Sequence, residues 1–439
     1  MSTRETFKIS LLAKMPKDVI NQFLSKDKTP FSVLFLSLLV GILAGLVGTY
    51  FEQAVHLVSE TRTDWLKSEI GSFLPLWLAA FLISAFLAFI GYFLVHRFAP
   101  EAAGSGIPEI EGAMDGMRPV RWWRVLPVKF FGGMGALGSG MVLGREGPTV
   151  QMGGAVGRMI SDIFRVKNED TRHSLLAAGA AGGLAAAFNA PLAGIMFVIE
   201  EMRPQFRYTL ISVRAVIISA VAANIVFRVI NGQDAVITMP QYDAPELSTL
   251  GLFLLLGALF GVFGVLFNYL ITLAQDLFVK FHRNDRKRYL LTGSMIGGCF
   301  GLLLLFVGRI FTTLLCFGSG APGGIFAPML ALGTLFGYAF GLIAKVWFPE
   351  LNIEPGMFTI AGMGALFAAT VRAPITGILL VIEMTNNYHL ILPLIITSLG
   401  AVIFAQLLGG QPIYSQLLHR TLKNQKLQQQ DLPPQSPNS

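Results

Sequence analysis

Long apolar segments recur along the chain, separated by short polar stretches. An α-helix needs about 20 apolar residues to cross a hydrocarbon core of ~30 Å. Phe31 to Val58 is long enough for a first span and Ser72 to Val95 for a second, and further spans follow as far as the region of Gly409. No stretch alternates for long as barrel strands do. The pattern predicts an all-α, polytopic membrane protein.

Composition supports this prediction. Of 439 residues, 53% are hydrophobic and 13% are charged, against ~25% charged in typical globular domains. Mean hydropathy is +0.62. We therefore expect membrane lipid around most of the chain. The two cysteines lie in apolar sequence without metal-ligand spacing, so neither a disulfide framework nor a zinc site is implied. No cofactor and no metal are predicted.

The net charge of +7 does not point to nucleic acid, because the basic residues cluster at the ends of apolar segments. By the positive-inside rule such clusters lie in the cytoplasm. We expect cytoplasmic termini on this basis, with residues 1–30 forming an amphipathic interfacial helix. The clusters run from Arg4 to Lys28, Arg118 to Lys129, Arg165 to Arg172, Lys280 to Arg288 and Arg420 to Lys426.

A charged pentapeptide, Gly144-Arg145-Glu146-Gly147-Pro148, lies between two apolar, glycine-rich stretches. Proline favours the first position of a helix, and glycines let backbone N–H groups converge before it. Such a helix start attracts anions. Glu146 would then be an anion that the protein supplies to its own site, replaceable by a free anion when protonated. A glycine turn with Arg145 paired to Glu146 is the structural alternative.

Part of the sequence occurs twice, with a constant offset of 183 residues. Ala178-Gly179, Ala190-Pro191, Gly194-Ile195 and Val198-Ile199-Glu200 recur as Ala361-Gly362, Ala373-Pro374, Gly377-Ile378 and Val381-Ile382-Glu383. Paired halves with Gly/Pro-interrupted segments indicate a substrate site at the midplane between repeats. We expect a first membrane repeat over 31–232, a second over 247–418, and a disordered cytoplasmic tail over 419–439.

Three glycine-rich motifs and a tyrosine occur in a fixed order: Gly104-Ser105-Gly106-Ile107-Pro108, Gly144 to Pro148, Gly324-Ile325-Phe326-Ala327-Pro328, and Tyr414. As a set they resemble the CLC family of chloride channels and chloride/proton exchangers, and within it the short bacterial antiporters. The resemblance implies an inverted-repeat helical bundle whose broken helices meet at a midplane anion site. It also implies a homodimer with one pore in each subunit, in the bacterial inner membrane.

The resemblance implies a role for individual residues. Ser105 and Tyr414 would donate hydroxyl groups to chloride, and the backbone N–H groups of Ile325 and Phe326 would cradle it. Glu146 would be the external gate that carries protons. Glu201 would be the internal proton acceptor, with Glu200 beside it on the cytoplasmic route. The implied function is exchange of chloride for protons, with a suggested role in acid resistance.

Each residue also has a plainer interpretation. Ser105 is a suitable helix N-cap, Tyr414 a belt aromatic, and Glu201 a carboxylate at a solvated helix end beside Arg203 and Arg207. Glu383 mirrors Glu200 in the duplication, and we expect a structural role for it.

Two other functions stay open. A passive chloride channel would need no internal proton site, so Glu201 favours exchange. An intramembrane hydrolase using Ser105 or Ser139 would need a base within reach, and the histidines lie mostly at segment ends. We therefore predict a transporter and not an enzyme.

The second half is shorter than the resemblance requires. Between Arg288 and Gly318, the family pattern calls for a span out, a connection and a span back, but Tyr289 to Phe317 offers only 29 residues. Either one fused span replaces the two crossings, or the segment is a shallow hairpin. A fused span would carry the third motif and Tyr414 to the opposite face, whereas the basic tail predicts the cytoplasmic face. A deletion that removes about one crossing and impairs transport is the hypothesis we draw.

Overall fold

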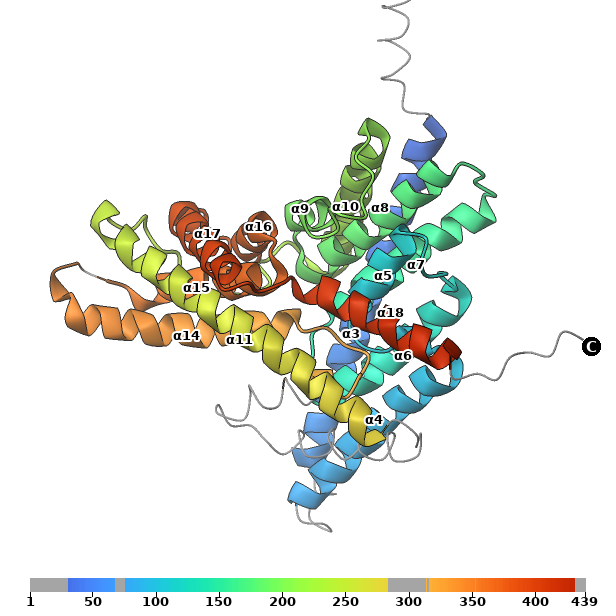
Figure 1. The fold of residues 1–439 in the computed structure, drawn as a ribbon, viewed down its shortest axis with the longest axis horizontal. Coiled ribbons are helices and arrows are strands. Elements are labelled where there is room, and N and C mark those ends of the chain that lie inside the picture. Colours follow the sequence, from blue (N-terminus) through green and yellow to red (C-terminus); the bar gives the residue numbers. More distant parts are fainter. Residues whose placement is uncertain (1–30, 68–75, 283–312, 314–315, 352, 431–439) are drawn as a thin grey trace, which may run out of the picture.

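A computed structural model describes residues 31–67, 76–282, 313, 316–351 and 353–430, most of them in helices (Figure 1). The first half comprises α3 (Phe31–Lys67), α4 (Leu76–Phe98), η2 (Pro100–Ala102), α5 (Ile107–Met114), α6 (Trp122–Gly138), α7 (Glu146–Ile163), α8 (Glu169–Phe188), α9 (Pro191–Glu200) and α10 (Leu210–Asn231). The second comprises η3 (Leu247–Thr249), α11 (Leu250–His282), α14 (Phe326–Trp347), η4 (Pro349–Leu351), α15 (Pro355–Val371), α16 (Pro374–Thr385), η5 (Tyr388–Leu390), α17 (Ile391–Leu407) and α18 (Ile413–Gln430).

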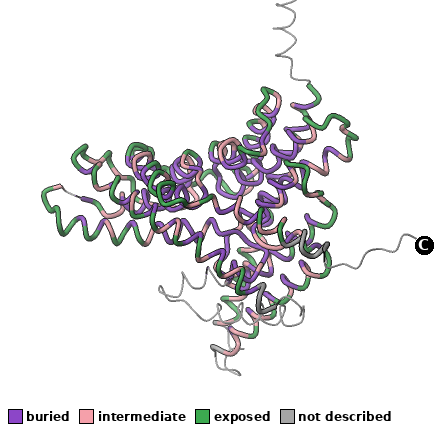
Figure 2. Tube along the Cα trace, viewed as in Figure 1, coloured by how far each residue is buried: buried purple, intermediate pink, exposed green. Residues whose placement is uncertain are grey.

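Span-length apolar helices confirm the predicted fold class. Within the described residues, six helical segments are long and apolar enough to cross a membrane. Buried residues gather where the helices meet, and exposed ones lie toward the periphery (Figure 2). Many exposed side chains are large and apolar, which suits contact with lipid and not with water. The six segments are Phe31–Leu66, Leu78–Phe98, Leu210–Asn231, Leu247–Phe278, Phe326–Trp347 and Tyr388–Leu407.

The duplication is confirmed as a structural repeat. Helix α8 packs between α7 and α10, and its counterpart α15 packs between α14 and α17. Glycines permit the close crossings: a Cβ on Gly153 would lie 2.2 Å from the Gly179 carbonyl oxygen, and one on Gly333 would lie 2.3 Å from that of Gly362. Both crossings therefore depend on small residues, as expected for packed membrane helices.

Matching turns follow α8 and α15. The residues after them, Asn189 and Arg372, both have positive φ, 52° and 73°. Each is followed by an Ala-Pro pair that begins the next short helix, α9 or α16. The left-handed residue ends one helix and the proline starts the next. The repeated residues therefore encode the same turn between helices in both halves of the chain.

The contacts of the basic tail bear on the fused-span alternative, whose own residues lie mostly outside the described part of the chain. Arg420 on α18 forms two hydrogen bonds with Asp276 on α11, at 2.9 and 2.7 Å. One cavity is lined both by Arg420 and Lys423 and by Arg118, Arg121 and Arg124 of the first half. The basic tail and the basic loop therefore share one face, as the charge pattern predicts.

The disordered tail expected over 419–439 is also corrected in part. Helix α18 continues to Gln430, so residues 419–430 are helical. Thr421 donates its hydroxyl to the Leu417 carbonyl, in regular helical register. The expected interfacial helix over 1–30, the tail beyond 430, and most of the shortened segment between 289 and 317 lie outside the described residues.

Candidate functional site

Glu146 begins α7, and its side chain reaches the other repeat. Its Oε1 atom accepts hydrogen bonds from the backbone N–H groups of Phe326 at 2.7 Å and Ala327 at 3.2 Å. These are the first residues of α14. The Glu146 carboxylate is fully buried and so occupies the N-terminus of a helix, where backbone dipoles favour negative charge.

The second and third motifs are paired directly. Gly144 and Gly324 form an antiparallel bridge, in which the N–H of each donates to the carbonyl of the other at 2.6 and 2.7 Å. This pairing holds the start of α7 against the start of α14. A Cβ on Gly144 would lie 2.0 Å from Glu146 Oε1, and one on Gly324 would lie 2.6 Å from it. Glycine at both positions leaves the room that the carboxylate fills.

Two buried hydroxyl groups belong to the same site. Ser105 is 3% exposed and Tyr414 is fully buried. Neither hydroxyl has a hydrogen-bond partner among the described residues, nor does the second oxygen of Glu146. Ser105 lies against Gly147, the residue after Glu146, because a Cβ on Gly147 would lie 2.6 Å from Ser105 Oγ. Buried hydroxyls without acceptors suit a bound anion.

The α14 amides that reach the Glu146 carboxylate are those of Phe326 and Ala327. The predicted pair was Ile325 and Phe326. Ile325 is buried and caps α14, so its amide lies one residue further from the contact. The part that the Ile325 amide takes in holding chloride stays a prediction.

Arg145 does not pair with Glu146, which removes the structural alternative for the pentapeptide. Its guanidinium donates to Glu52 on α3.

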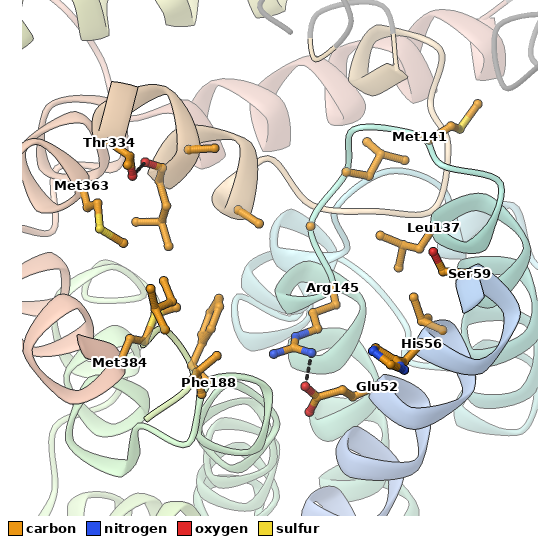
Figure 3. A pocket seen from close by; sticks show the side chains of 18 of the residues that line it. Glu52, His56, Ser59, Leu137, Met141, Arg145, Phe188, Thr334, Met363 and Met384 are labelled. Atoms are coloured by element: carbon orange, nitrogen blue, oxygen red, sulfur yellow. Dashed lines mark hydrogen bonds and ion pairs between the residues drawn. The ribbon is translucent and has the colours of Figure 1, made fainter. Parts of the chain in front are cut away.

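The side chains of Arg145 and Glu52 line a cavity of about 640 Å³, which His56 also lines (Figure 3). Gly144 and Ala327, on either side of the gate carboxylate, line the same cavity. This cavity therefore reaches the residues that flank the Glu146 carboxylate.

A second cavity, of about 900 Å³, approaches from the face that carries the basic loop and tail. Gly104, Ser105 and Gly106 of the first motif line it, together with Arg118 and Arg420. Glu146, Phe326 and Tyr414 line neither cavity. The buried residues of the motifs thus lie between two cavities that share no lining residue.

The internal carboxylates are buried. Glu201 is 8% exposed, so a solvated helix end is the wrong interpretation. Its electrostatic neighbours are Glu111 on α5 and Glu200, and Glu111 is 1% exposed. The electrostatic neighbours of the Tyr414 hydroxyl are Glu146, Glu201 and Glu111. Tyr414 therefore links the anion site electrostatically to a pair of buried carboxylates.

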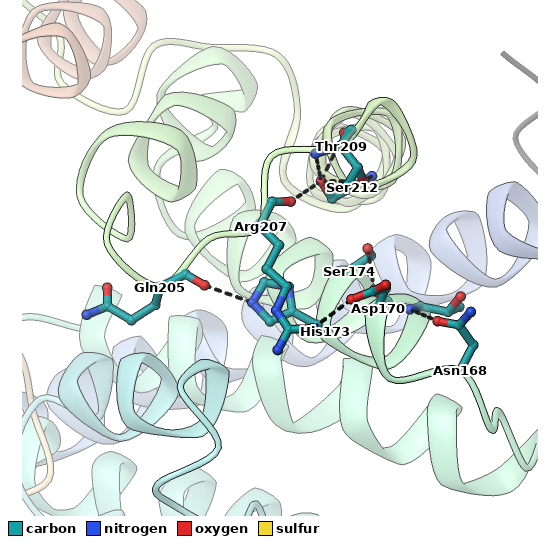
Figure 4. A network of polar contacts seen from close by, with 9 residues as sticks. Asn168, Asp170, His173, Ser174, Gln205, Arg207, Thr209 and Ser212 are labelled. Atoms are coloured by element: carbon teal, nitrogen blue, oxygen red, sulfur yellow. Dashed lines mark hydrogen bonds and ion pairs between the residues drawn. The ribbon is translucent and has the colours of Figure 1, made fainter. Parts of the chain in front are cut away.

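The segment after Glu201 is held by a polar network (Figure 4). A ring N–H of His173 donates to the Gln205 carbonyl at 2.9 Å, and Arg207 pairs with Asp170 at 2.6 Å. Thr209 and Ser212 then form a capping box that starts α10. These contacts fix the chain between α9 and α10, and with it the position of Glu201.

Sequence reasoning missed Lys129 and Glu111. Lys129 counted as part of a cytoplasmic basic cluster, but it is fully buried. Its ammonium group donates to the carbonyls of Ala102 at 2.9 Å and Gly104 at 2.7 Å, which supports the loop that carries Ser105. Its place in an apolar run was a usable signal, since charges inside membrane segments are usually functional. Glu111, one turn after the first motif, gave the same signal.

These features define a class of protein. The chain is a multi-span helical membrane protein built from a repeat, with a buried polar site where the broken helices of both repeats meet. It belongs to the voltage gated chloride channel family, whose model matches residues 86–305 and 288–406.

Relatives named as transporters are similar to the whole chain. A Vibrio cholerae serotype O1 protein named H(+)/Cl(-) exchange transporter ClcA is 94% identical over 468 aligned positions, covering 100% of both chains. A Klebsiella pneumoniae protein of the same name is 54% identical, covering 96% of this chain and 95% of that protein. The crystal structure of a slow cyanobacterial Cl−/H+ antiporter matches with a TM-score of 0.85 and 40% identity, covering 90% of this chain and 99% of that one.

The alignment with the Vibrio cholerae protein is longer than this chain. Its 468 positions exceed the 439 residues by 29, so the relative has residues that this chain lacks. The 439 residues of this chain are about 94% of the 468 aligned positions, which equals the identity of 94%. Almost all positions that differ between the two proteins are therefore positions at which this chain has no residue. The family model also matches in two segments that share residues 288–305. The comparison is therefore interrupted in the region that the sequence marks as short.

Proposed function

We propose that this protein exchanges chloride for protons as a secondary transporter. The observation that carries the proposal is the Glu146 carboxylate on the α14 N-terminus, between two cavities that share no lining residue. The Vibrio and Klebsiella relatives, both named H(+)/Cl(-) exchange transporter, support it.

Coupling follows from competition for the same donors. Ionised Glu146 accepts charge-assisted hydrogen bonds from Phe326 and Ala327, which are stronger than neutral ones. Protonation removes the charge, and the amides then become available to chloride. By linkage, chloride in the site in turn favours the protonated carboxyl group. Each exchange of carboxylate for chloride therefore carries a proton.

Chloride would be held without a full countercharge. The donors are the α14 amides and the hydroxyl groups of Ser105 and Tyr414. Partial charges bind an anion weakly enough for release, as transport requires. Glu201 would accept protons from the face that carries the basic loop, with Glu111 as its buried neighbour. A passive channel would have no need for these buried carboxylates, so exchange is the better account.

The location, assembly and physiological role of the protein belong to the same proposal. The protein would lie in a bacterial inner membrane as a homodimer with one pore in each subunit and cytoplasmic termini, and would contribute to acid resistance. It would carry out no covalent chemistry. The Ser139 hydroxyl donates to the Ala136 carbonyl, as a helix-end contact and not as an activated nucleophile.

The missing positions favour a second candidate, a transport-impaired form of the same exchanger. We infer that the segment absent relative to the Vibrio cholerae protein falls between residues 288 and 317. The described parts of both repeats nevertheless assemble the site. The two candidates differ in rate and not in the identity of the transported ions.

Liposomes containing the purified protein test the proposal. A chloride gradient is imposed without a pH gradient, and chloride and proton movements are recorded together. Exchange predicts that protons move against chloride. Chloride movement without protons would favour the channel, and no movement of either ion would favour the impaired form. In Glu146→Gln, chloride should move without coupled protons; coupling that persists in this variant would remove Glu146 from its role.

A further inference from the structure

Helices α9 and α16, one from each repeat, cap each other. Glu383 near the end of α16 accepts from the N–H groups of Leu192 at 3.1 Å and Ala193 at 2.9 Å, at the start of α9. Glu200 at the end of α9 accepts from the N–H groups of Ile375 at 3.1 Å and Thr376 at 2.7 Å, at the start of α16. The donors are 183 residues apart, as are the carboxylates.

These contacts replace local capping. The residues that precede the two helices, Ala190 and Ala373, provide no side-chain cap, and alanine is a poor N-cap. A carboxylate that accepts two N–H groups at a helix start satisfies two donors and complements the helix dipole. Thr376 adds a third bond, from its hydroxyl to Glu200 at 2.8 Å. The caps are therefore built into the contact between repeats.

The reciprocal caps act on the helix that carries Glu201. Helix α9 has only ten residues, from Pro191 to Glu200, and Glu201 follows directly as its C-cap. Its first turn is held by Glu383 and its last residue holds α16. Both ends of α9 are thereby tied to the second repeat, which also supplies the α14 amides of the anion site. The position of Glu201 relative to those amides depends on the two caps.

We propose that Glu383 and Glu200 are positioning residues for proton coupling, which hold Glu201 in register with the second repeat through the α9–α16 contact. The proposal rests on the exchange function and assigns Glu383 a part in it. It also gives Glu200 a structural duty in place of proton transfer, because both of its carboxylate oxygens are engaged by α16.

Glu383→Gln tests the proposal in liposomes. Glutamine offers one acceptor oxygen and turns its amide NH2, a donor, toward the other N–H group, so it cannot reproduce the cap. The variant should move fewer protons per chloride than the parent while chloride still moves. Glu200→Gln should lower the ratio to a similar extent, and the double variant should not show the sum of both losses. Glu350→Gln, at an exposed acidic residue of the second repeat, is the matched control.

The proton-to-chloride ratio separates positioning from stability. A merely structural defect reduces the amount of active protein and leaves the ratio unchanged. A normal ratio in Glu383→Gln with a lowered ratio in Glu200→Gln would overturn the proposal, because it would make Glu200 a direct proton carrier. If Glu383→Gln does not fold, Thr376→Val removes one donor to Glu200 and keeps both carboxylates. It should lower the ratio less, and an unchanged ratio would count against the proposal.

A second measurement does not depend on transport. Glu201→Cys introduces a thiol whose reaction rate with a water-soluble maleimide reports the surroundings of that position. Adding Glu383→Gln should change the rate, whereas adding Glu350→Gln should not. If the parent protein fails to exchange protons, the proposed function fails, and this labelling result still decides whether the caps position residue 201. An unchanged rate would refute the positioning role.

Discussion

Replacing Gly144 by alanine should displace the gate carboxylate without removing it. The added Cβ would lie 2.0 Å from Glu146 Oε1 and 2.2 Å from Oε2, far inside the ~3.5 Å at which nonbonded heavy atoms make favourable contact. The carboxylate must then leave the amides of Phe326 and Ala327. Two charge-assisted hydrogen bonds at about 1.5–3 kcal/mol each amount to at least ~3 kcal/mol. That shifts the balance between bound and displaced carboxylate by about 100-fold or more.

Chloride binding at alkaline pH measures this shift, since ordinary carboxyl groups are ionised there. In the parent protein, the ionised carboxylate competes with chloride and weak binding is expected by calorimetry. Gly144→Ala should bind chloride more tightly at alkaline pH and lose coupled proton movement in liposomes. Gly251→Ala is the matched control, because a Cβ there has nothing within 4 Å. Unchanged alkaline affinity together with intact coupling would refute the reasoning.

Two further predictions concern the internal side. Glu201→Gln should spare chloride flux and stop coupled protons, as recorded by paired chloride and pH electrodes, and unchanged acidification would exclude Glu201 as the acceptor. Lys129→Met should lower the melting temperature and weaken chloride binding, because each buried carbonyl left without a donor costs roughly 1–3 kcal/mol. Lys167→Met, at an exposed lysine, should change neither, and equal behaviour of both variants would contradict the assigned role of Lys129.

Local rules were enough to find the motifs and the repeat. Glycine followed by proline predicted the starts of α5 at Ile107 and α7 at Glu146, and a constant offset of 183 residues is visible without coordinates. The pairing of Gly144 with Gly324 was beyond such rules, since backbone groups carry no sequence signature. The partner of Arg145 was equally hidden: Glu52 lies 93 residues earlier, and the neighbouring Glu146 offered a closer but wrong choice.

The charge pattern predicted which basic segments lie together, but it misplaced Lys129. The basic clusters correctly predicted that the tail and the Arg118 loop share a side. Lys129 was grouped with that loop because sequence distance does not reveal burial, and the carbonyls that hold it come from a different segment. The polar composition of the tail suggested disorder, but Arg420 anchors α18 to α11, and the helix continues to Gln430.

The bridge between Gly144 and Gly324 limits how the protein can move. Transporters with repeats commonly work by rocking one repeat against the other around a fixed site. Here the two short backbone hydrogen bonds of the bridge lie inside the site itself. Rocking would pull apart the amides and carbonyls that form it and leave them buried without partners, which is costly. Side-chain rotation of Glu146 needs no such separation, so a conformational change confined to this carboxylate would leave the bridge intact.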